Sequence, residues 1–100
     1  MTDKIVRKVF NGFIYIHILH HGNKEPFYGS WMMEELREHG YSVSPGTLYP
    51  ILRSMLDEEL LEQEEVNVNG KIRKYYRTTE LGNEVLRDVK EKIEQLTHDI

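Results

Sequence analysis

The dipeptide Asn69-Gly70 is the sequence feature that most restricts how this chain can fold. It separates two runs rich in β-branched and aromatic residues, and Asn-Gly favours a two-residue hairpin turn because both positions tolerate a positive φ. If Val68 faces Lys71 across the turn, the pairing of both strands is fixed. The predicted cross-strand pairs are then Val66 with Arg73, Glu65 with Lys74, Glu64 with Tyr75, and Glu62 with Arg77.

Charge is distributed unevenly along this predicted hairpin. The whole chain has a formal net charge of -4, which argues weakly against a nucleic-acid partner. Residues 57–65 hold acids and no base, whereas residues 66–79 hold Lys71, Arg73, Lys74 and Arg77 and no acid. Because charges more than about 8–10 Å away are largely screened, the local charge of the hairpin, and not the net charge of the chain, determines whether it can bind a polyanion. Lys74 and Arg77 have acidic cross-strand neighbours. We therefore expect Lys71 and Arg73 to be the main contacts to an external polyanion, with Lys74 a weaker candidate.

A helix is predicted for residues 44–61, SPGTLYPILRSMLDEELL. Ser44 is a good N-cap and Pro45 a good first helical residue. Five of the six residues on one face of the helix that follows are apolar: Leu48, Ile51, Leu52, Met55 and Leu56, with Glu59 as the sixth. The opposite face begins with small or hydroxyl-bearing groups that allow close approach to a phosphate or a groove. Taken alone, this pattern also fits an ordinary amphipathic core helix. The candidate DNA contacts are Ser44, Pro45, Gly46, Thr47, Tyr49, Pro50 and Arg53.

Two further helices are predicted before this one. Residues 4–21 have helical apolar spacing after a cap at Thr2 or Asp3, although residues 13–19 also alternate like a strand; helix is favoured because no turn signal separates them from the preceding pattern. A loop over residues 22–27 leads to a second helix that ends at Gly40. Two short helices before a basic hairpin are typical of a winged helix-turn-helix. We also expect a slight bend at Pro50, which removes a backbone hydrogen bond.

The C-terminal stretch predicts a helix with Thr78 or Thr79 as its cap. Its apolar residues recur at steps of three and four, so this helix needs the first helix, a second subunit, or both to cover them. Lys90 and Lys92 flank the seam and favour antiparallel or mixed packing over a parallel coiled coil. The seam residues are Leu86, Val89, Ile93, Leu96 and Ile100.

Other residue patterns give weaker hypotheses. His17, His20 and His21 have spacing that could present metal ligands, but no carboxylate or thiolate lies near them in sequence, and imidazoles near a helix C-terminus also interact well with its dipole. We therefore expect no metal. Trp31, with Met32 and Met33, could line a pocket for an aromatic ligand, although such residues are more often core.

Several protein classes are excluded by what the sequence lacks. Without cysteine there is neither a disulfide framework nor a thiolate zinc site. No catalytic nucleophile with its base, phosphate-binding glycine loop or catalytic carboxylate pair is recognisable, so we expect neither an enzyme nor a bound cofactor. No signal peptide or membrane-length apolar segment is visible, which predicts a soluble, cytoplasmic protein without a membrane partner.

Three motifs together resemble the PadR-like transcriptional regulators: PFYG at 26–29, SPGTLYPILRSM at 44–55, and GKIRKYYRTTELG at 70–82. The resemblance covers residues 5–96, with Ser30-Trp31 where the family commonly has an aromatic and then an acidic residue. It implies a winged helix-turn-helix dimer that represses promoters, in some members released by small aromatic or cationic ligands. Its first and last helices would form the dimer interface, which we assign to Ile5, Val9, Leu86, Val89, Ile93 and Leu96.

The sequence therefore predicts an α+β, mostly helical protein: a winged helix-turn-helix DNA-binding domain over residues 1–78 and a C-terminal dimerisation helix over residues 79–100. We expect a homodimeric, sequence-specific regulator of double-stranded DNA acting on a pseudo-palindromic operator, with a small aromatic effector as a candidate ligand at the dimer interface. The alternative is a winged-helix protein-protein interaction module without DNA binding, which the net charge of -4 favours.

Overall fold

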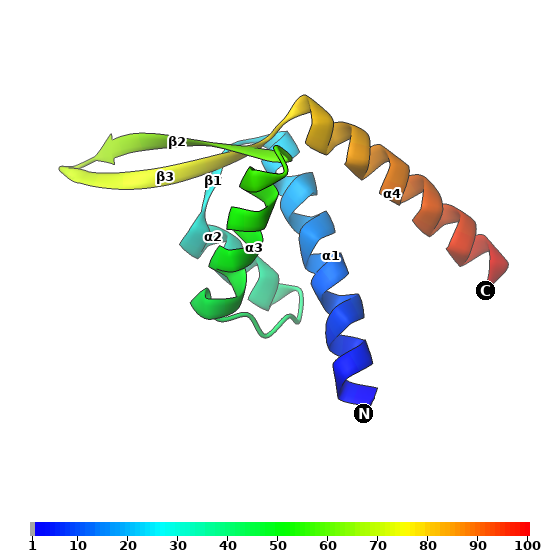
Figure 1. The fold of residues 1–100 in the computed structure, drawn as a ribbon. Helices are drawn as coiled ribbons and strands as arrows, with labels where there is room; N and C mark the ends of the chain where they lie inside the picture. Colours follow the sequence, from blue (N-terminus) through cyan, green and yellow to red (C-terminus); the bar gives the residue numbers. More distant parts are fainter. Residues whose placement is uncertain (1) are drawn as a thin grey trace.

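The computed structural model of the protein describes residues 2–100 and shows helices around one end of an antiparallel sheet (Figure 1). This confirms the predicted mostly helical α+β fold with a winged helix-turn-helix between an N-terminal and a C-terminal helix. The elements in chain order are α1 (Thr2–Lys24), β1 (Phe27–Tyr28), α2 (Gly29–Glu38), α3 (Pro45–Asp57), β2 (Leu61–Val68), β3 (Lys71–Thr78) and α4 (Glu80–Asp99).

Helix α1 settles the ambiguity over residues 13–19, which are helical as predicted. Ile14, Ile18 and Leu19 are all buried in the core, a spacing that one helical face allows, whereas strand alternation would place Leu19 on the face opposite Ile14 and Ile18. Thr2 and Asp3 lie inside the helix, so the prediction that one of them caps it is wrong. The loop predicted to begin at residue 22 is also wrong at its start, because α1 continues to Lys24.

The strand β1 was not predicted. Its two residues pair with β3, Phe27 with Tyr76 and Tyr28 with Tyr75, and make β3 the central strand in the order β1-β3-β2. The Phe27 and Tyr76 rings stack with their centroids 5.7 Å apart in the core. A strand of two residues is too short to show alternation, so it exists because of its tertiary partner.

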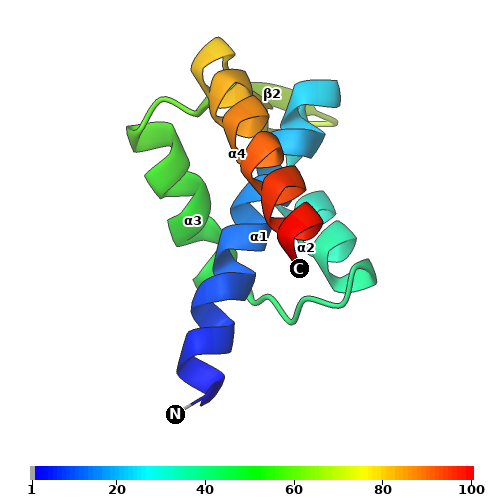
Figure 2. The same ribbon diagram turned by 90° about the vertical axis from the view of Figure 1, so that its right-hand side faces the viewer.

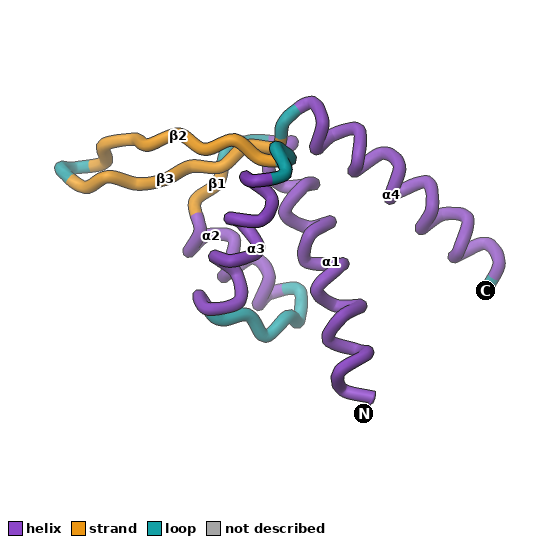
Figure 3. Tube along the Cα trace, in the orientation of Figure 1, coloured by secondary structure: helices purple, strands orange, loops and turns teal. Residues whose placement is uncertain are grey.

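Helix α2 ends within two residues of the predicted position. Gly40 has φ +88°, and the amides of Gly40 and Tyr41 donate to the carbonyls of Arg37 and Leu36. This is the Schellman arrangement, in which a left-handed residue closes the last turn. The teal connection in Figure 3 then leads to α3, whose N-cap is Ser44 as predicted. The Ser44 hydroxyl lies 3.3 Å from Thr47 Oγ1 and bonds no backbone amide.

Helix α3 ends at Asp57, so the prediction that it continues to residue 61 is wrong at its C-terminal end. Glu59 has φ +62°, and the Leu60 amide donates to the carbonyl of Met55, which closes the helix. Leu61 is then buried as the first residue of β2, opposite Thr78. A glutamate in the left-handed region is uncommon, and the residue type therefore gave no stop signal. Pro50 lies inside α3, and the helix continues past this residue to Asp57.

The hairpin has the predicted register throughout, with Val68 opposite Lys71 and Glu62 opposite Arg77. Asn69 and Gly70 have φ of +53° and +85°, as the predicted turn requires. The Arg77 and Glu62 side chains form an ion pair with a 3.3 Å separation. Beyond its base the hairpin projects away from the helices as a free wing (Figure 1).

The core lies where the helices meet the base of the sheet. At this junction α4 begins, and its N-cap is Thr79 and not Thr78. The Thr79 hydroxyl accepts from the Gly82 amide and donates to the Glu59 carbonyl. Thr78 is instead buried, and its hydroxyl donates to the Leu19 carbonyl. From this junction α1 and α4 diverge toward their free ends, as Figures 1 and 2 show together. The most completely buried side chains are Ile18, Met32, Leu36, Leu48, Leu52 and Met55.

Candidate nucleic-acid interface

Helix α3 divides into a buried and an exposed face as the sequence predicts. Leu48, Ile51, Leu52 and Met55 are buried against the core. The opposite face is open to solvent and begins at the positive dipole end of the helix. All seven residues of α3 and its cap that were predicted to contact DNA are exposed: Ser44, Pro45, Gly46, Thr47, Tyr49, Pro50 and Arg53.

Arg53 is the only basic side chain on this face, and it is already engaged. Its Nε lies 3.5 Å from the Asp57 carboxylate one turn later, with both side chains largely exposed. An exposed pair of this kind contributes only about 0.3–0.5 kcal/mol, so a phosphate can still compete for the guanidinium. Helix α3 itself nevertheless brings little net positive charge.

Tyr49 is held against the start of α2. An atom added at the Cβ position of Gly29 would lie 2.8 Å from both Cε1 and Cζ of the Tyr49 ring, so only glycine allows the ring to pack there. Tyr49 is still 44% exposed. The ring is therefore a positioned group on the outer surface, and the glycine of the PFYG motif is explained by this contact.

A recess of about 300 Å³ connects α3 to the wing. Tyr49 forms its α3 side, Ser30 its α2 side, and Ile72 and Lys74 line it from β3. Ser30 and Ile72 were absent from the predicted contacts. Ile72 is 63% exposed near the hairpin tip, where burial does not explain an apolar side chain. That isolated apolar residue between two bases was the sequence signal that could have identified it.

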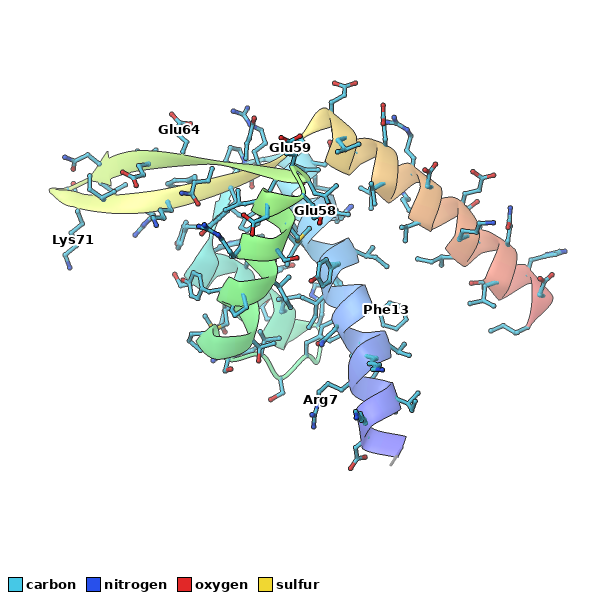
Figure 4. All side chains as sticks on the ribbon, viewed as in Figure 1. Arg7, Phe13, Glu58, Glu59, Glu64 and Lys71 are labelled. Carbon is cyan, nitrogen blue, oxygen red and sulfur yellow. The ribbon has the colours of Figure 1, made fainter. Side chains whose placement is uncertain are left out.

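The wing cations are arranged differently from one another. Lys71 points from the tip toward the side on which α3 lies, whereas Glu64 points away from it (Figure 4). Arg73 lies opposite Val66 and not opposite an acid, as the register predicted, and its guanidinium carbon lies 4.2 Å from the centre of the Tyr28 ring. Lys74 faces Glu65 in the register, but in the described hairpin the ion pair is the one between Arg77 and Glu62.

Of the three histidines predicted as weak metal candidates, His21 lies next to a carboxylate after all. Glu35 of α2 has its Oε1 3.6 Å from His21 Nε2 and 3.8 Å from His39 Nδ1, which sequence separation had hidden. Among the described residues no group of three or more His, Cys, Asp or Glu side chains has the arrangement of a metal site. Burial, above all, lowers the pKa of His17, His20 and His21 below the usual imidazole value.

Apolar side chains are exposed along the arms formed by α1 and α4. Leu86 is buried in the core of the chain and Val89 is half-buried, whereas the residues farther along the arms are open to solvent. Phe13 points from α1 toward the side of α4 (Figure 4). The exposed apolar residues of the two arms are Ile5, Val6, Val9, Phe10, Phe13, Leu81, Ile93, Leu96 and Ile100.

The fold and this surface define a winged helix-turn-helix protein. Residues 18–88 match the family model described as the Transcriptional regulator PadR-like family, and the chain belongs to that family. It is 40% identical over 85 residues to the transcriptional regulator Rv3488 of Mycobacterium tuberculosis, covering 85% of this chain and 79% of that protein. The protein is therefore a transcriptional regulator and not an enzyme, as predicted.

Solved structures agree with this assignment. A PadR family transcriptional regulator from Eggerthella lenta is 34% identical with a TM-score of 0.85, over 98% of this chain and 87% of that one. A PadR-like transcriptional regulator from Bacillus cereus is 31% identical with a TM-score of 0.83, over 92% and 91% of the two chains. None of the described helices is long and apolar enough to cross a membrane.

Proposed function

We propose that this PadR-like regulator is a sequence-specific repressor that binds double-stranded DNA as a homodimer. The observation that carries the proposal is the exposed N-terminal turn of α3 beside a projecting basic wing, joined to it by the recess at Tyr49. The small side chains of Ser44 to Thr47 let the helix approach base edges in the major groove. Lys71, Arg73 and Lys74 would hold the flanking phosphates.

The homodimer is supported by the exposed apolar arms. Covering α1 and α4 with a second copy would bury Ile5, Val9, Ile93 and Leu96, which the protomer leaves in water. Val89 would lie at the edge of this interface, with Leu86 supporting it from the core. In this proposal residues 1–78 form the DNA-binding domain and residues 79–100 form the dimerisation helix. Two-fold symmetry then places two half-sites about one helical turn, roughly 34–36 Å, apart.

An alternative function is a winged-helix module that binds protein instead of DNA. The net charge of -4 and the pairing of Arg53 with Asp57 favour it. A gel-shift titration against the DNA upstream of the protein's own gene distinguishes the two. DNA binding predicts a discrete shifted species that survives moderate salt and non-specific competitor. Complete absence of a shift at low salt would favour the protein-binding alternative.

Base reading by α3 is tested with Thr47→Ala. Because Thr47 lies on the first exposed turn, its loss should change which operator variants are preferred more than the overall affinity. Arg87→Ala, on the exposed surface of α4, is the matched control and should leave the preference unchanged. If Thr47→Ala bound every operator variant as the wild type does, this part of α3 would not read bases.

The dimer is tested by sedimentation equilibrium with Leu96→Glu and Gln95→Glu. Both add one charge to the last turns of α4, but only Leu96 belongs to the apolar seam. Leu96→Glu should shift the protein toward monomer, and Gln95→Glu should sediment as the wild type. A wild-type protein that is monomeric at micromolar concentration would contradict the homodimer.

A further inference from the structure

A cavity of about 340 Å³ lies within the protomer, between the C-terminal end of α1, the start of α2 and the base of the wing. The exposed apolar arms lie elsewhere on α1 and on α4, so this is not the interface at which an effector was expected from the sequence. Its volume is at the lower end of the range of small-molecule sites. The lining residues are His21, Lys24, Glu25, Pro26, Phe27, Tyr28, Trp31, Glu35 and Tyr75.

Aromatic rings form much of this lining. Trp31 was expected in the core, yet it is 37% exposed and opens onto the cavity while its neighbours Met32 and Met33 are buried. Its ring meets that of His21 edge-on, with centroids 5.5 Å apart. Tyr28 and Tyr75 are also edge-to-face, at 5.6 Å. Such open aromatic faces bind flat rings and organic cations.

The charged groups of the cavity select for the sign of a ligand. Glu35 is mostly buried, and its distances of 3.6 and 3.8 Å to His21 and His39 are too long for strong hydrogen bonds, so its carboxylate keeps acceptor capacity. Glu25 is a second acid and Lys24 is the base of the cavity, both exposed. Because burial lowers the pKa of His21, its imidazole is mainly neutral near pH 7 and does not balance Glu35.

We propose that this cavity binds a small planar aromatic cation, with the ring against Trp31 and Tyr75 and the nitrogen donors directed to Glu35. The site goes beyond the proposed function, since it needs neither DNA nor a second subunit. It also lies next to the wing, because Tyr28 both lines the cavity and carries the guanidinium of Arg73.

Trp31 is the only tryptophan of the chain, so its fluorescence reports directly on the cavity. The full-length protein is titrated, without DNA, with benzamidine and with benzoate, which share a flat ring but carry opposite charges. Benzamidine should change the fluorescence saturably, and benzoate should bind at least about tenfold more weakly, as expected when a charge-assisted hydrogen bond cannot form. Equal binding of the two, or a linear response to benzamidine, would overturn the proposal.

Glu35→Gln tests the carboxylate. It should weaken benzamidine binding roughly tenfold or more, because a neutral amide replaces the charged acceptor. Glu38→Gln, on the exposed surface of the same helix, should bind as the wild type. A folded Glu35→Gln protein, judged by circular dichroism, that retained wild-type benzamidine affinity would contradict the assignment. The comparison of benzamidine with benzoate needs no variant, so the proposal stays testable if Glu35→Gln does not fold.

Discussion

The guanidinium of Arg73 stacks on the ring of Tyr28, 4.2 Å from its centre. Arg73 belongs to the wing and Tyr28 to the short strand before α2, so this contact connects the wing to the helix-turn-helix. It holds a cation in one orientation before any DNA arrives. A positioned charge loses less side-chain freedom on binding than a free one.

Replacing Tyr28 should therefore weaken DNA binding without removing a phosphate contact. A cation-π contact at an exposed site contributes about 0.5–1 kcal/mol, which corresponds to roughly two- to five-fold in affinity. We expect a loss of this size for Tyr28→Leu, measured by fluorescence anisotropy with the operator. Tyr28→Phe keeps an aromatic face and should bind nearly as the wild type. A Tyr28→Phe protein as weak as Tyr28→Leu would mean that the phenol, and not the ring, is needed.

Gly29→Ala tests whether the packing of Tyr49 matters for sequence reading. The new methyl group would meet the Tyr49 ring, which must move. Because an exposed side chain can yield more easily than backbone, we expect the free energy of unfolding to change by less than about 1 kcal/mol. The preference among operator variants should change, and competition binding measures it. An unchanged preference would show that Tyr49 does not meet the bases.

Gly82→Ala should destabilise the fold for a different reason. A Cβ at Gly82 would lie 2.7 Å from Thr78 Cγ2 and would also collide with the backbone carbonyl of Leu60, which cannot move aside easily. We expect a loss of about 1–3 kcal/mol in urea unfolding, as for overpacked sites. Gly12→Ala is the control, because open space surrounds Gly12 in α1 and the change should stabilise by up to about 1 kcal/mol. Equal effects of the two would contradict the packing described.

The histidines make stability depend on pH. In the folded protein the pKa values of His17, His20 and His21 are lowered, first by burial. The unfolded chain, with imidazole pKa values near 6.5, then binds more protons, and stability must rise with pH in that window. Stability should be complete above about pH 6.5 and fall as the pH drops through that value toward the folded pKa values.

Thermal melting from pH 8 to pH 5 checks this dependence. The charged neighbours act in both directions, since Glu35 raises the pKa of His17 and His21 while His39 and Lys24 lower those of the imidazoles near them. His17→Gln should reduce the fall in melting temperature below pH 6.5 because it removes one proton-binding site of the unfolded chain. A wild-type melting temperature that rose on acidification would contradict the predicted loss of stability at low pH.

The elements set by local chemistry were predictable, and those set by tertiary contacts were not. Asn69-Gly70 fixed the hairpin register, and Ser44-Pro45 fixed the start of α3. In contrast, β1 exists through its pairing with β3, and α3 ends where Glu59 adopts a left-handed conformation. Neither depends on a residue type that marks it in the sequence.

The candidate site shows the same division. The exposed face of α3 followed from helical periodicity, because a 3.6-residue repeat assigns each side chain to a face. The stacking of Arg73 on Tyr28 and the approach of Glu35 to His21 join residues far apart in the chain. Exposure of Trp31 beside the buried Met32 was likewise invisible, since all large apolar residues give the same signal in the sequence.

The most direct test of DNA binding by α3 and the wing is the salt dependence of operator affinity. Removing one cation that neutralises a phosphate should reduce the slope of log K against log salt concentration by about 0.9. For a protein with both Lys71→Ala and Arg73→Ala, we expect weaker binding and a slope smaller by roughly 1.8 per wing. Arg87→Ala should leave the slope unchanged. A slope for the double variant equal to that of the wild type would contradict phosphate binding by the wing.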